Sequence, residues 1–152
     1  MSALTDVTAL DGVTLVTMQD GENRFNLPFV TALEQILLTA SNEGPPIVLT
    51  GAGKFFSNGL NLDWMGSAGA DGSHAAMARL HRVLARLLAL PGATLAALNG
   101  HAFGAGASSS GDDDLVPTAL ARGGELACKD GPTVGAIKQS LYRSKLAALA
   151  KD

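Results

Sequence analysis

The sequence predicts an α/β fold, and three observations lead to this class. Short apolar runs alternate along the chain with longer stretches whose apolar side chains recur at helical spacing. Two of the short runs lead into glycine-rich loops, Gly51–Gly59 and Asn99–Gly106, and one amphipathic stretch separates the two loops. The strand–loop–helix unit therefore occurs twice, which favours parallel strands with helices packed on the sheet.

The N-terminal region is predicted to form a hairpin followed by a helix. Thr5–Leu10 and Val13–Met18 are rich in β-forming residues, and Gly12 between them accepts the positive φ angle of a tight turn. Pro28 suits a first helical position, and the helical spacing ends before Gly44. One face of this helix is predicted to be buried, with the side chains of Phe29, Leu33, Ile36, Leu37 and Ala40.

Two buried strands and a long helix are predicted next. Ile47–Thr50 is a short apolar strand before the first glycine loop, and Thr94–Leu98 is the equivalent strand before the second. Between them, Ser73 can cap a helix that Pro91 ends. Its apolar stripe, expected to lie mostly in the core, consists of Met77, Leu80, Val83, Leu84, Leu87 and Leu88.

The C-terminal third changes character. Residues 108–116 are mostly small, polar and acidic and have no apolar periodicity, so they are interpreted as a linker. The chain is thus predicted to divide into a core of residues 1–107, this linker, and a helical segment of residues 117–152. Two helices are expected in that segment, Pro117–Cys128 and Pro132–Leu149, the second with one side formed by Val134, Ile137, Leu141 and Tyr142.

Composition excludes several classes of protein. With 152 residues, of which 47% are hydrophobic, the chain can bury one core. The net charge of -3 and the lack of a dense basic cluster argue against nucleic acid as a partner. The apolar stretches end well short of the roughly 20 residues of a membrane span. A lone cysteine, Cys128, and an N-terminus without a secretory pattern lead us to expect a cytoplasmic protein.

Several common motifs do not fit. Lys54 in the first loop is followed by Phe55 instead of Ser or Thr, so the phosphate-binding P-loop pattern fails, and no dinucleotide-binding glycine pattern follows a strand. His74 and His81 lack the spacing of metal ligands, so no metal site is expected. Each glycine loop taken alone could be an ordinary tight turn, whereas the pair in this order favours a site.

Taken together, the two glycine loops resemble the signature loops of the crotonase superfamily, the enoyl-CoA hydratase/isomerase family. The likeness covers residues 5–107 and 118–149, and the sequence of Phe56–Leu60 is more similar to Δ3,Δ2-enoyl-CoA isomerases than to hydratases. The resemblance implies a crotonase-like core of ββα units arranged in a spiral, here truncated and followed by C-terminal helices. It also implies an acyl-CoA thioester as substrate in fatty-acid metabolism, no cofactor apart from the coenzyme A of the substrate, and a homo-oligomer.

By the same resemblance, the site lies at the two loops. Negative charge that develops on a thioester oxygen can be stabilised by two converging backbone N–H groups, and glycines let the main chain approach closely. The resemblance assigns these oxyanion donors to the backbone of Asn58 and Ala105. The substrate-binding residues it implies are Arg24, Phe25, Leu27, Asn58, Gly59, Leu60, Asn61 and Gly104, with Arg24 near a CoA phosphate.

The chain departs from the family after the second loop. Hydratases of the family carry one glutamate where this chain has Ser108, and a second glutamate in a later segment. Neither is found, and roughly a hundred family residues are missing beyond Ala107, which implies an internal deletion. The solvated aspartates Asp112–Asp114 lack the fixed position and tuned pKa of a general base. Two hypotheses follow: an enoyl-CoA isomerase or hydratase, and a shortened, non-catalytic protein that retains at most CoA-thioester binding.

Overall fold

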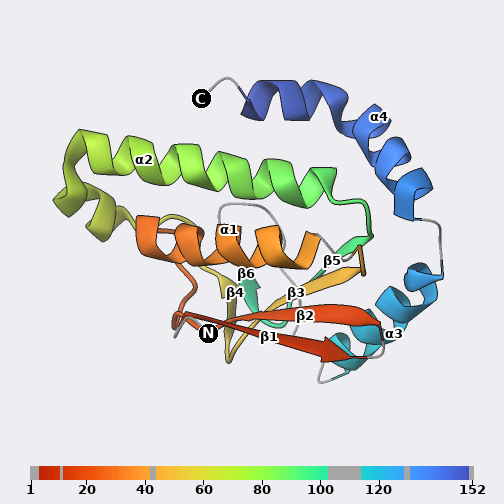
Figure 1. The fold of residues 1–152 in the computed structure, drawn as a ribbon. Helices are drawn as coiled ribbons and strands as arrows, with labels where there is room; N and C mark the ends of the chain where they lie inside the picture. The colour runs from red at the N-terminus through yellow and green to blue at the C-terminus, as the bar shows by residue number, and fades with distance from the viewer. Residues whose placement is uncertain (1–3, 11, 42–43, 103–113, 129–130, 151–152) are drawn as a thin grey trace.

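The computed structural model describes residues 4–10, 12–41, 44–102, 114–128 and 131–150 (Figure 1). A four-stranded sheet has the order β1-β2-β3-β5, and a two-stranded sheet pairs β4 with β6. The strands are β1 (Thr5–Leu10), β2 (Val13–Met18), β3 (Ile47–Gly51), β4 (Phe55–Ser57), β5 (Thr94–Ala97) and β6 (His101–Ala102). The predicted hairpin is confirmed, because β1 and β2 are antiparallel with Leu10 opposite Val13. The predicted parallel pairing is also confirmed, since β3 runs parallel to both β2 and β5.

Helices cover both faces of the larger sheet. The helices are α1 (Leu27–Ser41), α2 (Leu62–Ala89), α3 (Leu115–Ala127) and α4 (Gly131–Leu149). Helix α1 packs against α2 on one side of the sheet, α3 contacts β2, β3 and β5, and α4 lies along α2 (Figure 1). No helix in the described part of the chain combines the length and apolarity needed to cross a membrane.

The core follows the alternation of side chains along the strands. Towards α1 and α2, the strands and helices bury Val16, Met18, Phe29, Leu33, Leu37, Ile47, Val83 and Leu90. On the other face, Val13, Val48 and Ala97 pack against apolar side chains of α3. A Cβ on Gly123 of α3 would lie 3.2 Å from both methyl groups of Val13, so glycine lets this helix sit close to β2. The C-terminal segment therefore contributes directly to the core of the N-terminal part.

Helix α2 begins earlier than the sequence analysis predicts. The cap is Asn61 instead of Ser73, with the Asn61 side chain accepting a hydrogen bond from the Trp64 N–H. Gly69 then breaks the helical geometry with a φ of 71°, and the Ser73 hydroxyl donates to the Met65 carbonyl at 3.0 Å across this kink. The glycine-rich run around the kink has the composition of a loop, which is why the first turns of α2 are missed.

The boundaries at the C-terminal end differ slightly from expectation. Helix α3 begins at Leu115, inside the range predicted as linker, and the rest of that linker lies outside the described residues except for Asp114. On α4, the predicted apolar side faces solvent in large part, because the exposed fractions of Ile137 and Leu141 are 53% and 70%. The buried contact of α4 is made instead around Gly135, whose Cβ position is 3.2 Å from Pro91.

Lys138 fastens α4 to the core. Its ammonium donates to the carbonyls of Leu87 and Gly92, each at 3.1 Å, and approaches the Thr94 hydroxyl at 3.4 Å. Because Leu87 lies in the last turn of α2, the Lys138 ammonium also interacts favourably with the dipole of α2. Burial lowers the pKa of Lys138, so part of this gain is offset by desolvation.

Replacing Lys138 with alanine is expected to lower the free energy of unfolding by about 1–2 kcal/mol, because two carbonyls lose a charged donor at a partly exposed position. Urea denaturation followed by circular dichroism measures this difference. Lys145→Ala provides the control, since Lys145 is an exposed lysine on the same helix and should change stability by less than about 0.5 kcal/mol. Equal stabilities of the two variants would contradict the role of Lys138.

Candidate functional site

The described start of the second glycine loop, residues 99–102, lies beside the first loop because the side chain of Asn99 joins them. Its amide oxygen accepts from the Gly51 N–H at 2.9 Å and from the Thr50 hydroxyl at 3.2 Å. Its amide nitrogen donates to the Gly53 carbonyl at 3.0 Å. Gly100 is required next to it, since a Cβ there would lie 2.1 Å from the Lys54 carbonyl oxygen. The beginning of the second loop is therefore locked onto the first.

The rest of the second loop lies outside the described residues, and Gly104 and Ala105 with it. The prediction that Ala105 supplies one of the oxyanion donors stays a prediction. What the structure describes in detail is the first loop, Gly51–Leu60, and the turn that holds it.

That turn is centred on Asn23, which is fully buried and has a φ of 50°. Its amide nitrogen donates to the carbonyls of Phe55 and Phe56 at 3.0 and 3.1 Å. Its amide oxygen accepts from the Asp20 N–H at 2.9 Å, and its carbonyl accepts from the Ser57 hydroxyl at 2.8 Å. Asparagine suits this position because its side chain tolerates left-handed backbone geometry. Asn23 thereby ties β4 to the segment before α1.

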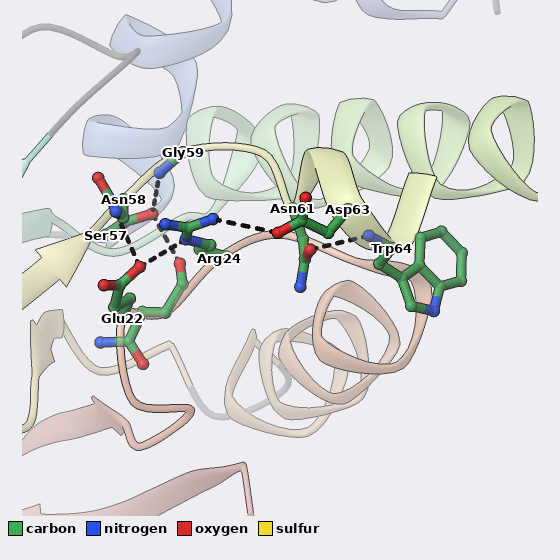
Figure 2. Close-up of polar contacts among 9 residues, drawn as sticks. Glu22, Arg24, Ser57, Asn58, Gly59, Asn61, Asp63 and Trp64 are labelled. Carbon is green, nitrogen blue, oxygen red and sulfur yellow. Dashed lines mark hydrogen bonds and ion pairs between the residues drawn. The ribbon is translucent and has the colours of Figure 1, made fainter. Parts of the chain in front are cut away.

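Glu22 makes two separate contacts with Asn58, of which Figure 2 shows the one between the two side chains. The Glu22 carbonyl accepts from the Asn58 N–H at 2.8 Å, and the Glu22 carboxylate accepts from the Asn58 side-chain amide at 2.9 Å. The same carboxylate oxygen accepts from Arg24 Nε at 2.5 Å. Hydrogen bonds from Asn58 and then from Arg24 lower the pKa of Glu22, so that its carboxyl group is ionised at neutral pH.

Arg24 lies between Glu22 and Asp63 (Figure 2). One end of the guanidinium contacts Glu22, and the other is 4.0 Å from the carboxylate of Asp63, whose side chain is 96% exposed. The Arg24 side chain itself is 37% exposed. The predicted substrate-binding residue Arg24 is thus brought next to the loop, already paired with two acidic side chains.

Phe25 and Leu60 are adjacent and form an isolated β-bridge. The Phe25 N–H donates to the Gly59 carbonyl at 2.8 Å, and the Phe25 carbonyl accepts from the Asn61 N–H at 2.9 Å. The Phe25 ring stacks on Phe29 with ring centroids 5.9 Å apart, so it packs towards the core. Leu27 is half-buried at the start of α1.

The N–H groups of the loop differ in whether they are occupied. Asn58 donates to Glu22, Gly59 donates to the Ser57 hydroxyl at 3.2 Å, and Asn61 donates to Phe25. Among the described residues, the N–H of Leu60 has no hydrogen-bond partner. Gly59, with a φ of 75°, turns the chain just before Leu60. The sequence analysis assigned an oxyanion donor to Asn58, whose N–H donates to Glu22 in this structure, whereas the N–H of Leu60 has no partner among the described residues.

Next to Glu22 the surface is hollowed. The lining of this groove consists of Gln19, Gly21, Glu22, Ala52, Gly53, Lys54 and Phe55.

The part of the chain that the structure describes contains no group of three histidine, cysteine or acidic side chains placed to hold a metal ion.

Sequence reasoning missed Glu22 and Asn23. The run Asp20–Asn23 is rich in turn-forming residues, and this signal could have predicted a turn there. It could not have predicted the partners, because the hydrogen bonds of Asn23 reach residues more than thirty positions away.

Comparison with known proteins identifies the fold and the family. Residues 8–116 match the family described as Enoyl-CoA hydratase/isomerase. Enoyl-CoA delta isomerase 3 from Arabidopsis thaliana is 40% identical over 107 residues, which make up 64% of this chain and 43% of that protein. Enoyl-CoA delta isomerase 2, peroxisomal, from the same plant is 42% identical over 97 residues, 57% of this chain and 40% of its own length. The chain thus spans about two fifths of the length of these curated relatives.

Among solved structures, an enoyl-CoA hydratase, EchA3, from Mycobacterium ulcerans Agy99 superposes with a TM-score of 0.84 over 97% of this chain and 95% of its own. At 16% identity this likeness concerns the fold, which is the predicted crotonase-like core with C-terminal helices. The family match covers well over half of the sequence and includes the first loop and the described start of the second. The chain belongs to the enoyl-CoA hydratase/isomerase family.

Proposed function

We propose that the chain binds acyl-CoA thioesters and stabilises their enolates at the first glycine loop, the chemistry of an enoyl-CoA isomerase or hydratase in fatty-acid metabolism. The observation that carries the proposal is that the N–H of Leu60 has no partner among the described residues, whereas the N–H groups of its neighbours Asn58, Gly59 and Asn61 are all occupied. A backbone N–H that is held in place without a partner can donate a hydrogen bond to an oxygen on which negative charge develops, and no existing hydrogen bond has to break first. Leu60 takes the role first expected of Asn58.

The other residues of the proposed site have distinct roles. Ala105 would supply the second donor, and Gly104 would let the substrate approach it. Arg24 would meet a phosphate of coenzyme A, since its guanidinium is partly exposed and is held beside the loop. Gly59 and Asn61 would shape the loop around the thioester, and coenzyme A would enter only as part of the substrate.

A second candidate function, thioester binding without turnover, is favoured by one observation. The carboxylates of Glu22 and Asp63 both lie within ion-pair distance of Arg24. A general base works best with a pKa near the operating pH, whereas the pKa of Glu22 is lowered. Together with the family glutamates missing from the sequence, this pairing supports a shortened, non-catalytic protein.

The assembly proposed for the chain is a homo-oligomer in the cytoplasm. The exposed apolar side chains of Ile137 and Leu141 on α4 support self-association, because a second copy could cover them. Size-exclusion chromatography at micromolar concentration tests the oligomer, and a clean monomer peak would contradict it.

Titration of the purified protein with acetoacetyl-CoA tests the function. Binding in an oxyanion hole shifts this ligand to its enolate, which absorbs in the near ultraviolet. An enolate signal followed by turnover of a 3-enoyl-CoA would support the enzyme. A signal without turnover would support binding alone, and the lack of any enolate signal would contradict both functions.

A further inference from the structure

Glu22 contacts Asn58 in a way that an ordinary surface acid would not. Its main chain and its side chain both accept from the same residue, at 2.8 and 2.9 Å, so Asn58 is held at its backbone and at its amide together. A single exposed ion pair holds a loop weakly, because two long side chains lose freedom for little gain. Here the hydrogen bond of the carboxylate is combined with a main-chain hydrogen bond between the same two residues, so the two residues are held together at two points.

The main-chain half of the contact is fixed from behind. Asn23 follows Glu22 directly and is buried, with its side chain bonded to Asp20, Phe55 and Phe56. The position of the Glu22 carbonyl is therefore set by a rigid turn. Asn58 in turn lies two residues before Leu60, with only Gly59 between them.

From this arrangement we propose that Glu22 is a positioning residue for the Leu60 donor. Its ionised carboxylate accepts from the side-chain amide of Asn58 and its carbonyl accepts from the Asn58 N–H, while the N–H of Leu60, two residues further on, has no hydrogen-bond partner among the described residues. The inference rests on the proposed function for its link to ligand affinity, but the positioning of Asn58 can be measured without any ligand.

If Glu22 positions the loop in this way, the affinity of the protein for acetoacetyl-CoA depends on the charge of Glu22. The groups that face its carboxylate are Arg24 and Asn58, with Asp63 beyond Arg24 and Lys54 in the adjoining groove. Asn58 and Arg24 hold the pKa of Glu22 below its usual range. The contact requires the ionised form of Glu22, whose pKa is lowered in the folded protein. The contact is therefore intact at neutral pH and is lost only as the pH falls through this lowered pKa.

Amide hydrogen exchange, followed by NMR on the full chain, tests the positioning directly. In the unmodified protein the Asn58 N–H should exchange more slowly than that of Leu60. Glu22→Ala should raise the exchange rate of Asn58 by about two- to fivefold, the range expected when one partly exposed charged partner is removed. Glu22→Gln, which keeps an acceptor of the same size, should restore part of the protection. Unchanged Asn58 exchange in Glu22→Ala would overturn the proposal.

Glu125→Gln is the matched control. Glu125 is an exposed glutamate that also contacts an arginine, Arg122, at 2.5 Å, and it lies on α3 away from the loop. Its substitution should leave the exchange of both Asn58 and Leu60 unchanged. An equal rise in Asn58 exchange in this control would mean a general loss of stability and would overturn the assignment to Glu22.

Acetoacetyl-CoA titration as a function of pH tests the link to the site. The ratio of the Kd of Glu22→Gln to that of the unmodified protein should be about two- to fivefold at neutral pH and fall towards one in acid, because the ligand's own titration cancels in the ratio. A ratio constant with pH would overturn the charge dependence. If the unmodified protein gives no enolate signal, the proposed function fails, while the exchange experiment still decides the role of Glu22.

Discussion

Replacing Leu60 with proline is expected to weaken enolate binding by about 100-fold. Removal of one backbone donor from an oxyanion hole typically costs a factor of about 100–1,000 in the step that it stabilises. Proline removes the N–H and fixes its own φ at about −65°. The enolate absorbance of acetoacetyl-CoA, titrated against the variant and the unmodified protein, measures the loss.

The variant is informative because the Leu60 N–H has no partner to lose among the described residues. The Leu60 carbonyl, which accepts from the Leu62 N–H at 3.1 Å, is retained. Leu60→Ala is the paired control: it shortens the side chain but keeps the N–H, and its affinity should fall by less than about fivefold. Circular dichroism should show folded protein in both variants. Equal affinities for the proline and alanine variants would rule out Leu60 as the donor.

Much of the fold could be predicted because its signals are local. The hairpin β1–β2 is marked by β-forming residues around Gly12, and both of its strands have the predicted bounds. Strands β3 and β5 are short apolar runs, and each ends within one residue of its predicted end. These elements depend on patterns of a few neighbouring residues, which a sequence displays directly.

The missed elements depend on contacts between distant residues. Strands β4 and β6 are very short, and they exist because Phe55 and His101 are brought into register by the locked loops. The first turns of α2 have a loop-like composition and are set by the Asn61 cap. For such segments the tertiary contacts outweigh local propensity.

The same reasoning explains the correction within the site. The resemblance assigned the site to this loop, but it could not show which N–H of the loop lacks a partner among the described residues. That depends on Glu22 and Phe25, which occupy the N–H groups of Asn58 and Asn61 from a separate part of the chain. Which N–H of the loop can act as an oxyanion donor depends on which neighbouring N–H groups are already hydrogen-bonded, and those hydrogen bonds are seen only in the folded chain.

Asn23→Asp is expected to lower the free energy of unfolding by about 3 kcal/mol or more. The change keeps the shape of the side chain, its tolerance of a positive φ and its acceptor for the Asp20 N–H. It replaces the donor to Phe55 and Phe56 with a carboxylate oxygen facing two carbonyl oxygens. Each buried carbonyl left without a donor costs about 1–3 kcal/mol, and burial of an unpaired charge adds to this.

Urea denaturation measures this loss, and Asn61→Asp provides the matched control. The Asn61 side chain uses its oxygen to cap α2, and aspartate caps a helix equally well, so the same chemical change there should cost less than about 0.5 kcal/mol. If the two variants were equally stable, Asn23 would not be the anchor of the loop. If Asn23→Asp is much the less stable, the turn before α1 holds β4 in place, and the geometry of the Leu60 donor depends on a buried amide that never touches the ligand.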